Sequence, residues 1–189
     1  MLEELIQLDR EAFLYLNSLG TETWDGFWLF ITKTWSAFPL YLLLLILSYL
    51  RLGLRRTLFL LVAIALLITV TDQLSNFFKY GLQRLRPCYD PEIGDLTRLV
   101  KASCGGKYSY FSAHAANSFA VAGFFARLLK SKWGSFGAFL LLWAAFVAYS
   151  RIYLGVHFPL DVISGAAVGL IMSWLFYRLY IFAMHKYQV

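Results

Sequence analysis

Ionisable side chains stand where long apolar stretches of this sequence begin and end. His157 and Asp161 open the last such stretch, and Pro159 between them suits the first turn of a helix. Because residues four apart share one helix face, the Asp161 carboxylate can accept a hydrogen bond from one imidazole nitrogen and leave the other free to attack. The spacing predicts a nucleophilic histidine; the alternative is a structural histidine–aspartate pair at a helix start.

Three cations accompany this pair. Lys79 ends one apolar stretch, Arg86 follows seven residues later, and Arg151 ends another stretch. Two helical turns would place Lys79 and Arg86 on one side of a helix, and an arginine can make two parallel hydrogen bonds to phosphate oxygens. Cations around histidines and a carboxylate suit phosphoryl transfer, in which charge must be stabilised and the leaving oxygen protonated.

A second helix start lies at Ser112, Ala113 and His114. Ser112 is the expected N-cap of a helix that begins at Ala113. The free N–H groups of a helix N-terminus bind phosphate oxygens well, and His114 would face the same anion. A histidine at the end of an apolar stretch is more commonly an interfacial residue, so His114 is a candidate because of its neighbours.

The elements that must position these residues are membrane helices. Hydrophobic residues make up 60% of the 189 positions, charged residues 15%, and mean hydropathy is +0.62, whereas a soluble domain needs a more polar surface. Gly165 and Gly169, four apart, predict close helix packing. An all-α integral membrane bundle with about five transmembrane spans is expected, because uncharged stretches approach the roughly 20 residues that cross a bilayer: Thr34–Leu50, Thr57–Thr71, Tyr108–Ala126, Trp133–Ser150 and Val162–Tyr177.

Two further segments flank these spans. Residues 2–18 place apolar side chains such as Leu2, Ile6 and Phe13 among acids, so residues 1–34 are predicted to form interfacial helices, the first of them amphipathic. Residues 80–109 are the long polar segment, predicted to be an ordered outer loop over the active site. No repeat or linker divides the chain, so residues 1–189 are expected to form a single domain.

The net charge is +6, and the basic residues responsible for it fall into two sets, which argues against a nucleic-acid partner. One set defies the positive-inside rule by lying on the predicted outer side, where anion binding would explain it: Lys79, Arg84, Arg86, Arg98, Lys101, Lys107 and Arg151. The other set lies in short connections and the tail, which alternate threading places on the cytoplasmic side: Arg51, Arg55, Arg56, Arg127, Lys130, Lys132, Arg178 and Lys186. No basic segment precedes an apolar one at the N-terminus, so no cleavable signal peptide is expected.

Both cysteines, Cys88 and Cys104, fall in the outer loop. In an oxidising compartment they can form a disulfide that would stabilise the fold by about 3 kcal/mol in the chain-entropy model. The alternative is a pair of free thiols in a cytosolic loop. The disulfide is favoured because the topology was inferred without it.

Three motifs together resemble the type 2 phosphatidic acid phosphatase superfamily. The segment from Lys79 to Pro87 matches the pattern K, six residues, RP, and the segment from Ser150 to Asp161 fits SR, five residues, H, three residues, D. Between them, Phe-Ser-Ala-His at 111–114 is similar to the family's PSGH, with phenylalanine for proline and alanine for glycine. Alanine resists a positive φ, so the anion site would change if the family's loop needs that conformation.

The resemblance implies a mechanism without metal or cofactor. His157 would attack phosphorus and become phosphorylated, Asp161 would orient it, and His114 would protonate the leaving group and then activate water. The phosphate would be held by Lys79, Arg86, Ser112, the backbone N–H of Ala113 and Arg151.

We therefore expect a membrane lipid phosphate phosphatase whose site faces the periplasm or cell exterior of a bacterial-type inner membrane, with a cytoplasmic C-terminus. Expected substrates are undecaprenyl diphosphate, phosphatidylglycerol phosphate or phosphatidic acid; the alternative is lipid A, because residues 114–117 are similar to lipid A phosphatases. Membrane lipids are the expected partners, without nucleic acid or an obligate protein partner. An inactive lipid-binding scaffold is disfavoured because all six motif residues are present.

Overall fold

The computed structural model describes residues 1–129 and 134–187, which form helices and loops without a strand, as the sequence predicts. Lys130, Lys132 and the first residue of the predicted span Trp133–Ser150 lie outside the described residues. The α-helices are α1 (Leu2–Ser18), α2 (Glu22–Ile31), α3 (Phe38–Leu82), α4 (Ala113–Leu128), α5 (Gly134–Tyr153) and α6 (Pro159–Lys186). Short 3-10 turns are η1 (Thr34–Ala37), η2 (Pro87–Tyr89) and η3 (Gly94–Leu96).

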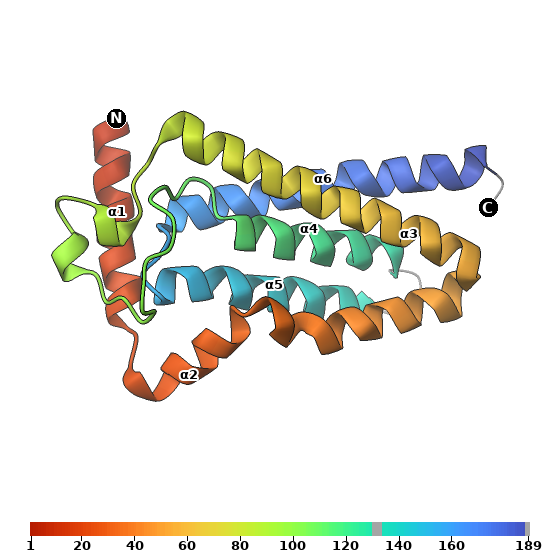
Figure 1. The fold of residues 1–189 in the computed structure, drawn as a ribbon, viewed down its shortest axis with the longest axis horizontal. Helices are drawn as coiled ribbons and strands as arrows, with labels where there is room; N and C mark the ends of the chain where they lie inside the picture. The colour runs from red at the N-terminus through yellow and green to blue at the C-terminus, as the bar shows by residue number, and fades with distance from the viewer. Residues whose placement is uncertain (130–133, 188–189) are drawn as a thin grey trace.

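Helix α3 is bent back on itself at Gly53, where φ is 77°. Glycine adopts this conformation without a Cβ clash, and the two arms run in opposite directions and diverge from the bend (Figure 1). Within the described residues, three helical segments are long and apolar enough to cross a membrane: Thr34–Leu82, Ser135–Tyr153 and Pro159–Lys186. The first contains both arms of α3, which carry the first two predicted spans.

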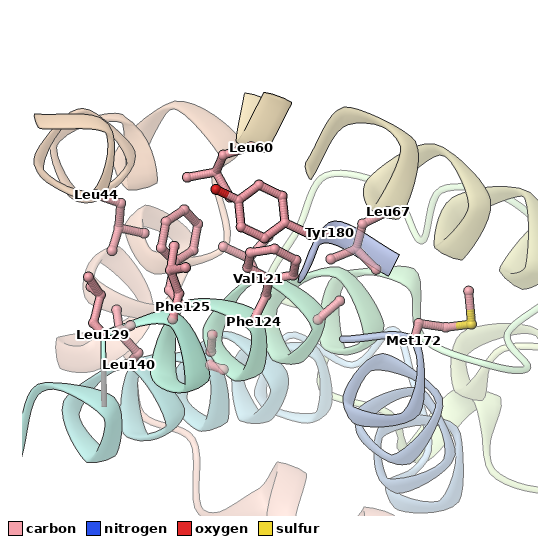
Figure 2. Packing of buried hydrophobic residues seen from close by; sticks show 14 residues of the cluster. Leu44, Leu60, Leu67, Val121, Phe124, Phe125, Leu129, Leu140, Met172 and Tyr180 are labelled. Carbon is pink, nitrogen blue, oxygen red and sulfur yellow. The ribbon is translucent and has the colours of Figure 1, made fainter. Parts of the chain in front are cut away.

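Helix α4 packs against α3, α5 and α6 in the middle of the bundle. Its buried Val121, Phe124 and Phe125 meet Leu60 from α3 and Tyr180 from α6 in the main apolar core (Figure 2). The predicted close packing at the two glycines of α6 is confirmed, because a Cβ at Gly165 would lie 2.6 Å from the Ser112 carbonyl oxygen and one at Gly169 would lie 2.2 Å from that of Ala116.

Helix α1 lies across one end of the bundle (Figure 1). Its packed face consists of Asp9, Phe13 and Asn17, which are spaced by one helical turn. The Asn17 amide donates to the carbonyl oxygens of Arg98, Ile152 and Tyr153 and accepts from the Arg98 N–H. Phe13 is buried, whereas Leu2 and Ile6 are exposed, and two polar side chains complete the contact; the interfacial position of this helix stays a prediction.

The two ends of the bundle differ in content. One end holds α1, α2, the connection from residue 83 to 112, and the first turns of α4 and α6 (Figure 1). The other end holds the bend of α3 beside Arg51, Arg55 and Arg56, together with the C-terminal end of α6. All the residues predicted to carry chemistry belong to the first end.

Candidate active site

His157 lies in the turn before α6 and not on the helix itself, so the prediction that it shares a helix face with Asp161 is wrong. The chain turns at Gly155, where φ is 77°, and α6 begins at Pro159. The turn nevertheless brings the His157 Nδ1 atom 3.5 Å from Oδ2 of Asp161, without a hydrogen bond to Nδ1. His157 is 2% exposed. Burial, and then the nearby Arg151, lower the pKa of His157 well below its usual value, so the free imidazole is neutral.

Asp161 is held by Arg84, which the sequence analysis grouped with the basic residues expected to bind an anion but which the structure pairs with carboxylates. Asp161 Oδ2 accepts a hydrogen bond from the Phe158 N–H at 3.0 Å, and Oδ1 accepts one from Arg84 Nη1 at 2.9 Å. The guanidinium also lies 4.2 Å from the centre of the Phe158 ring. The Asp161 side chain is fully buried, so this arginine supplies its counter-charge.

The other side of Arg84 is held by Asp9 of α1. Arg84 Nη2 donates to Asp9 Oδ2, and Asp9 Oδ1 accepts the Leu160 N–H at 2.9 Å. Asp9 is 4% exposed; burial raises its pKa, and the hydrogen bond from Arg84 opposes that rise. We call Asp9, Arg84 and Asp161 the paired network. It joins three segments far apart in sequence.

The three predicted phosphate-binding cations line one cavity, but they are not brought there by a shared helix face as predicted. Helix α3 ends at Leu82, and Gln83 adopts a positive φ of 51°, so Lys79 and Arg86 do not share a helix face. Arg86 instead follows the turn and lines the cavity with Lys79 and Arg151. Within residues 1–129 and 134–187, none of these three cations forms an ion pair with a carboxylate.

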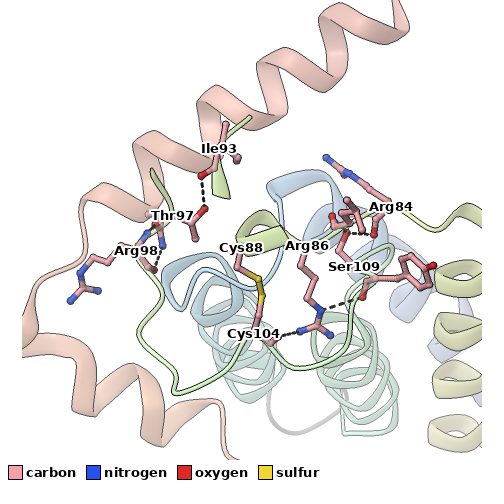
Figure 3. Close-up of a disulfide and its surroundings, with 11 residues drawn as sticks. Arg84, Arg86, Cys88, Ile93, Thr97, Arg98, Cys104 and Ser109 are labelled. Atoms are coloured by element: carbon pink, nitrogen blue, oxygen red, sulfur yellow. Dashed lines mark hydrogen bonds between the residues drawn. A yellow bond between two sulfur atoms is a disulfide. The ribbon is translucent and has the colours of Figure 1, made fainter. Parts of the chain in front are cut away.

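Hydrogen bonds to neutral oxygens orient two of these cations. Arg86 donates to the carbonyl oxygens of Cys104 at 2.7 Å and Tyr108 at 3.2 Å (Figure 3). Arg151 donates to the Thr32 hydroxyl. Burial lowers the pKa of Arg86, although an arginine remains charged at neutral pH. An anion entering the cavity would meet cations whose charge no carboxylate neutralises.

Cys88 and Cys104 form a disulfide, with their Cα atoms 6.4 Å apart (Figure 3). Because the Cys104 carbonyl accepts from Arg86, the disulfide braces the loop that holds this cation. The Arg86 N–H also donates to the Lys107 carbonyl at 3.1 Å. Covalent and hydrogen bonds thus link distant parts of the segment 83–112 to one another.

The three residues predicted at the start of α4 differ in whether they line the cavity. Ser112 is the N-cap, as predicted, and its hydroxyl accepts the Ala115 N–H at 3.5 Å. It is fully buried and does not line the cavity, so the structure does not bring this hydroxyl to the predicted phosphate position. Ala113 and His114 do line the cavity. In the described part of the chain, Gln83 is the one non-glycine residue with positive φ; alanine at 113 therefore meets no conformational obstacle.

Phenylalanine at position 111 is accommodated in the core. Its side chain is 1% exposed and packs against Phe78, with ring centres 5.7 Å apart. Its carbonyl oxygen accepts a hydrogen bond from the Ser75 hydroxyl at 2.9 Å. This residue packs beneath the start of α4 and does not line the cavity.

The cavity has a volume of about 410 Å³ and is lined by both histidines and the three cations, while Asp161 lies behind its wall. It shares Thr32, Lys33, Thr34, Tyr41 and His114 with a groove of about 1010 Å³. Apolar side chains dominate the groove: Leu29, Phe30, Trp35, Phe38 and Pro39. A polar phosphate site beside an apolar groove fits an amphipathic ligand.

Comparisons with known proteins agree with this arrangement. The lipid A 4'-phosphatase of Bacteroides thetaiotaomicron is 38% identical over 189 residues, covering 98% of this chain and 81% of that protein. The undecaprenyl-diphosphatase of Sulfolobus acidocaldarius is 32% identical over 177 residues, covering 92% of this chain and 77% of that protein. The crystal structure of Aquifex aeolicus LpxE matches with a TM-score of 0.65 and 28% identity, covering 89% of this chain and 93% of that one.

The family itself is shown by a match that covers more than half of the chain. Residues 56–184 match the PAP2 superfamily, a range that contains all three motifs and every cavity-lining cation named above except Lys33. Together with the membrane-length helices, this match shows that the chain belongs to the PAP2 superfamily of membrane lipid phosphatases.

Proposed function

We propose that the chain hydrolyses a lipid phosphate ester in two steps through a phosphohistidine at His157. The supporting observation is that His157 and His114 line one cavity with Lys79, Arg86 and Arg151. In the first step, His157 Nε2 bonds to phosphorus, the ester P–O bond breaks, and the leaving oxygen takes a proton from His114. In the second step, His114 takes a proton from water, whose oxygen bonds to phosphorus as the N–P bond breaks.

The paired network supplies the orientation that this mechanism requires. The Asp161 carboxylate faces His157 Nδ1 and would stabilise the positive charge that the ring acquires on phosphorylation. Arg84 and the Phe158 N–H fix the carboxylate, and Asp9 fixes Arg84. In this proposal, Arg84 and Asp9 are positioning residues, whereas the cations in the cavity bind the phosphate oxygens.

The proposed substrate is a lipid A-type phosphate, and undecaprenyl diphosphate is the second candidate. The apolar groove beside the cavity supports a lipid, and the names of the two relatives support these two headgroups. Phosphate release from lipid A, undecaprenyl diphosphate, phosphatidylglycerol phosphate and phosphatidic acid, measured as kcat/KM on one preparation, would rank them. A higher value for the diphosphate than for lipid A would reverse the order.

The mechanism is tested by trapping phosphorus on the enzyme. His157→Ala should abolish phosphate release, and His114→Ala should accumulate acid-labile phosphoenzyme from a substrate with a good leaving group, because that variant lacks the base of the second step. His185→Ala, which changes a histidine at the other end of the bundle, is the matched control. Wild-type turnover by His157→Ala would disprove the nucleophile assignment.

We also propose that the cavity faces the periplasm or cell exterior and that the C-terminus is cytoplasmic. Arg51, Arg55 and Arg56 lie at the opposite end of the bundle from the cavity, and basic connections favour the cytoplasmic side. Residues 1–34 would lie at the outer interface and residues 80–109 over the site, within a single domain. After reduction, a membrane-impermeant maleimide should label Cys88 and Cys104 in intact cells; labelling only after lysis would place the site inside.

A further inference from the structure

The cavity contains two polar side chains that the proposed mechanism does not use. Asp72 from α3 and Asn117 from α4 both line it. Within the described residues, the Asp72 carboxylate makes no hydrogen bond or ion pair, and Asn117 Oδ1 is buried without a partner. Neither residue belongs to the three sequence motifs.

Helix geometry places both residues deeper in the bundle than the phosphate-binding groups. Asp72 precedes Lys79 by two turns, or about 10 Å along the second arm of α3, which runs toward the site end. Asn117 follows His114 by three residues, or about 4.5 Å along α4, which runs away from that end. The cavity therefore has cations and histidines at its outer end and two hydrogen-bond acceptors at its inner end.

Among the described residues, no protein donor is hydrogen-bonded to these two acceptors, although the charge of Lys79 acts on Asp72. The cavity lining also includes Tyr41, Ile68, Trp143 and Val147, which are mainly apolar. A carboxylate inside a membrane span is costly unless something satisfies it, and such residues usually mark a ligand site. The groups that would satisfy Asp72 and Asn117 are hydroxyl or amide N–H donors on a bound molecule.

We infer that Asp72 and Asn117 form a subsite for hydroxyl and amide groups of a phosphorylated sugar headgroup. The inference rests on the proposed function, because the ester phosphate must lie among the outer cations. His114 would protonate the ester oxygen, so the alcohol portion of the substrate extends from His114 toward Asn117, one turn further along the same helix. The acyl chains leave through the apolar groove that shares Tyr41 and His114 with the cavity.

The same subsite disfavours two other kinds of lipid phosphate. A prenyl phosphate offers no donor, so it would leave both acceptors unsatisfied, and sites built to hydrogen-bond a substrate reject analogues that lack the group. A diphosphate that extended inward would bring a second anion toward the Asp72 carboxylate, and like charges repel. The subsite thus favours a sugar monophosphate through hydrogen bonds and disfavours a diphosphate through charge repulsion.

The test compares an acylated glucosamine 4-phosphate with farnesyl phosphate and farnesyl diphosphate. Asp72→Leu and Asn117→Leu should each lower the ratio of kcat/KM for the sugar phosphate to that for farnesyl phosphate by about tenfold or more, mainly through KM. Asp72→Asn keeps an acceptor and removes the charge. It should lower the ratio of sugar phosphate to farnesyl phosphate less than Asp72→Leu does, and it should raise kcat/KM for the diphosphate. Thr69→Val, on the exposed side of α3, should alter neither ratio.

Equal losses for the sugar phosphate and farnesyl phosphate in both leucine variants would overturn the subsite. The subsite would also be overturned if Asp72→Asn, the variant that best preserves the shape of the site, left the relative kcat/KM values of the three substrates unchanged. Phosphoenzyme trapping on the same preparations separates this failure from failure of the mechanism: phosphate on His157 with unchanged ratios rejects the subsite alone, whereas wild-type enzyme that never traps phosphate there rejects the mechanism.

Discussion

Two arginines separated by one residue belong to regions of opposite character. Arg84 lies in the paired network, between carboxylates that are almost wholly buried. Arg86 lies in the cavity, where its guanidinium donates to carbonyl oxygens and has no carboxylate partner. Leu85 lies between them and forms an antiparallel bridge with Tyr108.

This difference separates groups that keep the site in shape from groups that we propose to contact phosphate. The Arg84 charge in the paired network is compensated by two carboxylates, so it contributes to folding and leaves little positive field for a ligand. The cations of the cavity form no ion pair among the described residues, which costs stability but attracts an anion. Removing Arg84 should therefore mainly lower stability, whereas removing a cation of the cavity should mainly lower catalysis.

Arg84→Gln should produce the largest change. It leaves Asp9 and Asp161 buried without a counter-charge, and breaking a buried ion pair costs about 3–5 kcal/mol. Thermal unfolding in detergent, followed by tryptophan fluorescence, should show this loss together with loss of phosphatase activity.

Arg86→Gln is the matched comparison for that variant. It removes hydrogen bonds to carbonyl oxygens, each with a net value of about 1 kcal/mol, but it also removes a phosphate-binding cation, for which a rate loss of about 100-fold is typical. The separation of the two regions would be refuted if Arg86→Gln lost as much stability as Arg84→Gln.

Replacing Cys88 and Cys104 by serine should rank second. The disulfide restricts the unfolded chain by an amount worth about 3 kcal/mol, and it braces the carbonyl that orients Arg86. The double variant should unfold at lower temperature and show a raised KM, whereas the ion pairs of the paired network should persist. An unchanged KM would show that Arg86 keeps its position without the covalent link.

The pH dependence of stability should report the buried His157. Its folded pKa lies below its usual value of 6.5, so below about pH 6.5 the unfolded chain binds a proton that the folded chain does not. Stability is therefore retained above this pH and lost as pH falls, by at most about 1.4 kcal/mol per pH unit for one group. Between pH 8 and pH 5, wild type should lose more stability than His157→Gln; parallel losses would contradict this expectation.

Asp9→Asn should have the smallest effect on stability. The amide oxygen can still accept the Leu160 N–H, and the variant no longer buries a charge, so the change should stay within about 1 kcal/mol. Arg84 loses one of its two anchors, which should lower kcat several-fold and leave KM near its original value. Glu11→Gln, on the exposed face of the same helix, provides the control; equal kcat values for the two variants would remove Asp9 from the mechanism.

The sequence predicts the helical membrane class and most of the cavity because these depend on local patterns. Apolar stretches identify the helices, and the spacing of His114, Arg151 and His157 from those stretches brings them to one end. Local patterns cannot predict the paired network, because the partners of Arg84 lie 75 and 77 residues away in the sequence. Asp72 escaped notice for a related reason: a single acid at the edge of an apolar stretch has no visible partner until the helices are packed.

Local spacing also produced two wrong expectations with a common cause. His157 and Asp161, and likewise Lys79 and Arg86, were expected to share a helix face. In both pairs the chain leaves the helix between the two residues, through the turn before α6 in one case and at Gln83 in the other. The paired residues still converge, because loops held by tertiary contacts replace helical periodicity.

The glycine contact between α4 and α6 has a consequence for how this enzyme tolerates its surroundings. The two helices touch through backbone atoms at Gly165 and Gly169, and each carries one of the two histidines at or just before its first turn. Because no flexible side chain intervenes, α6 cannot slide along α4 without a steric clash. The separation between His157 and His114 should then be independent of lateral pressure, and we expect the enzyme to work in bilayers of differing thickness without adjusting the geometry of its site.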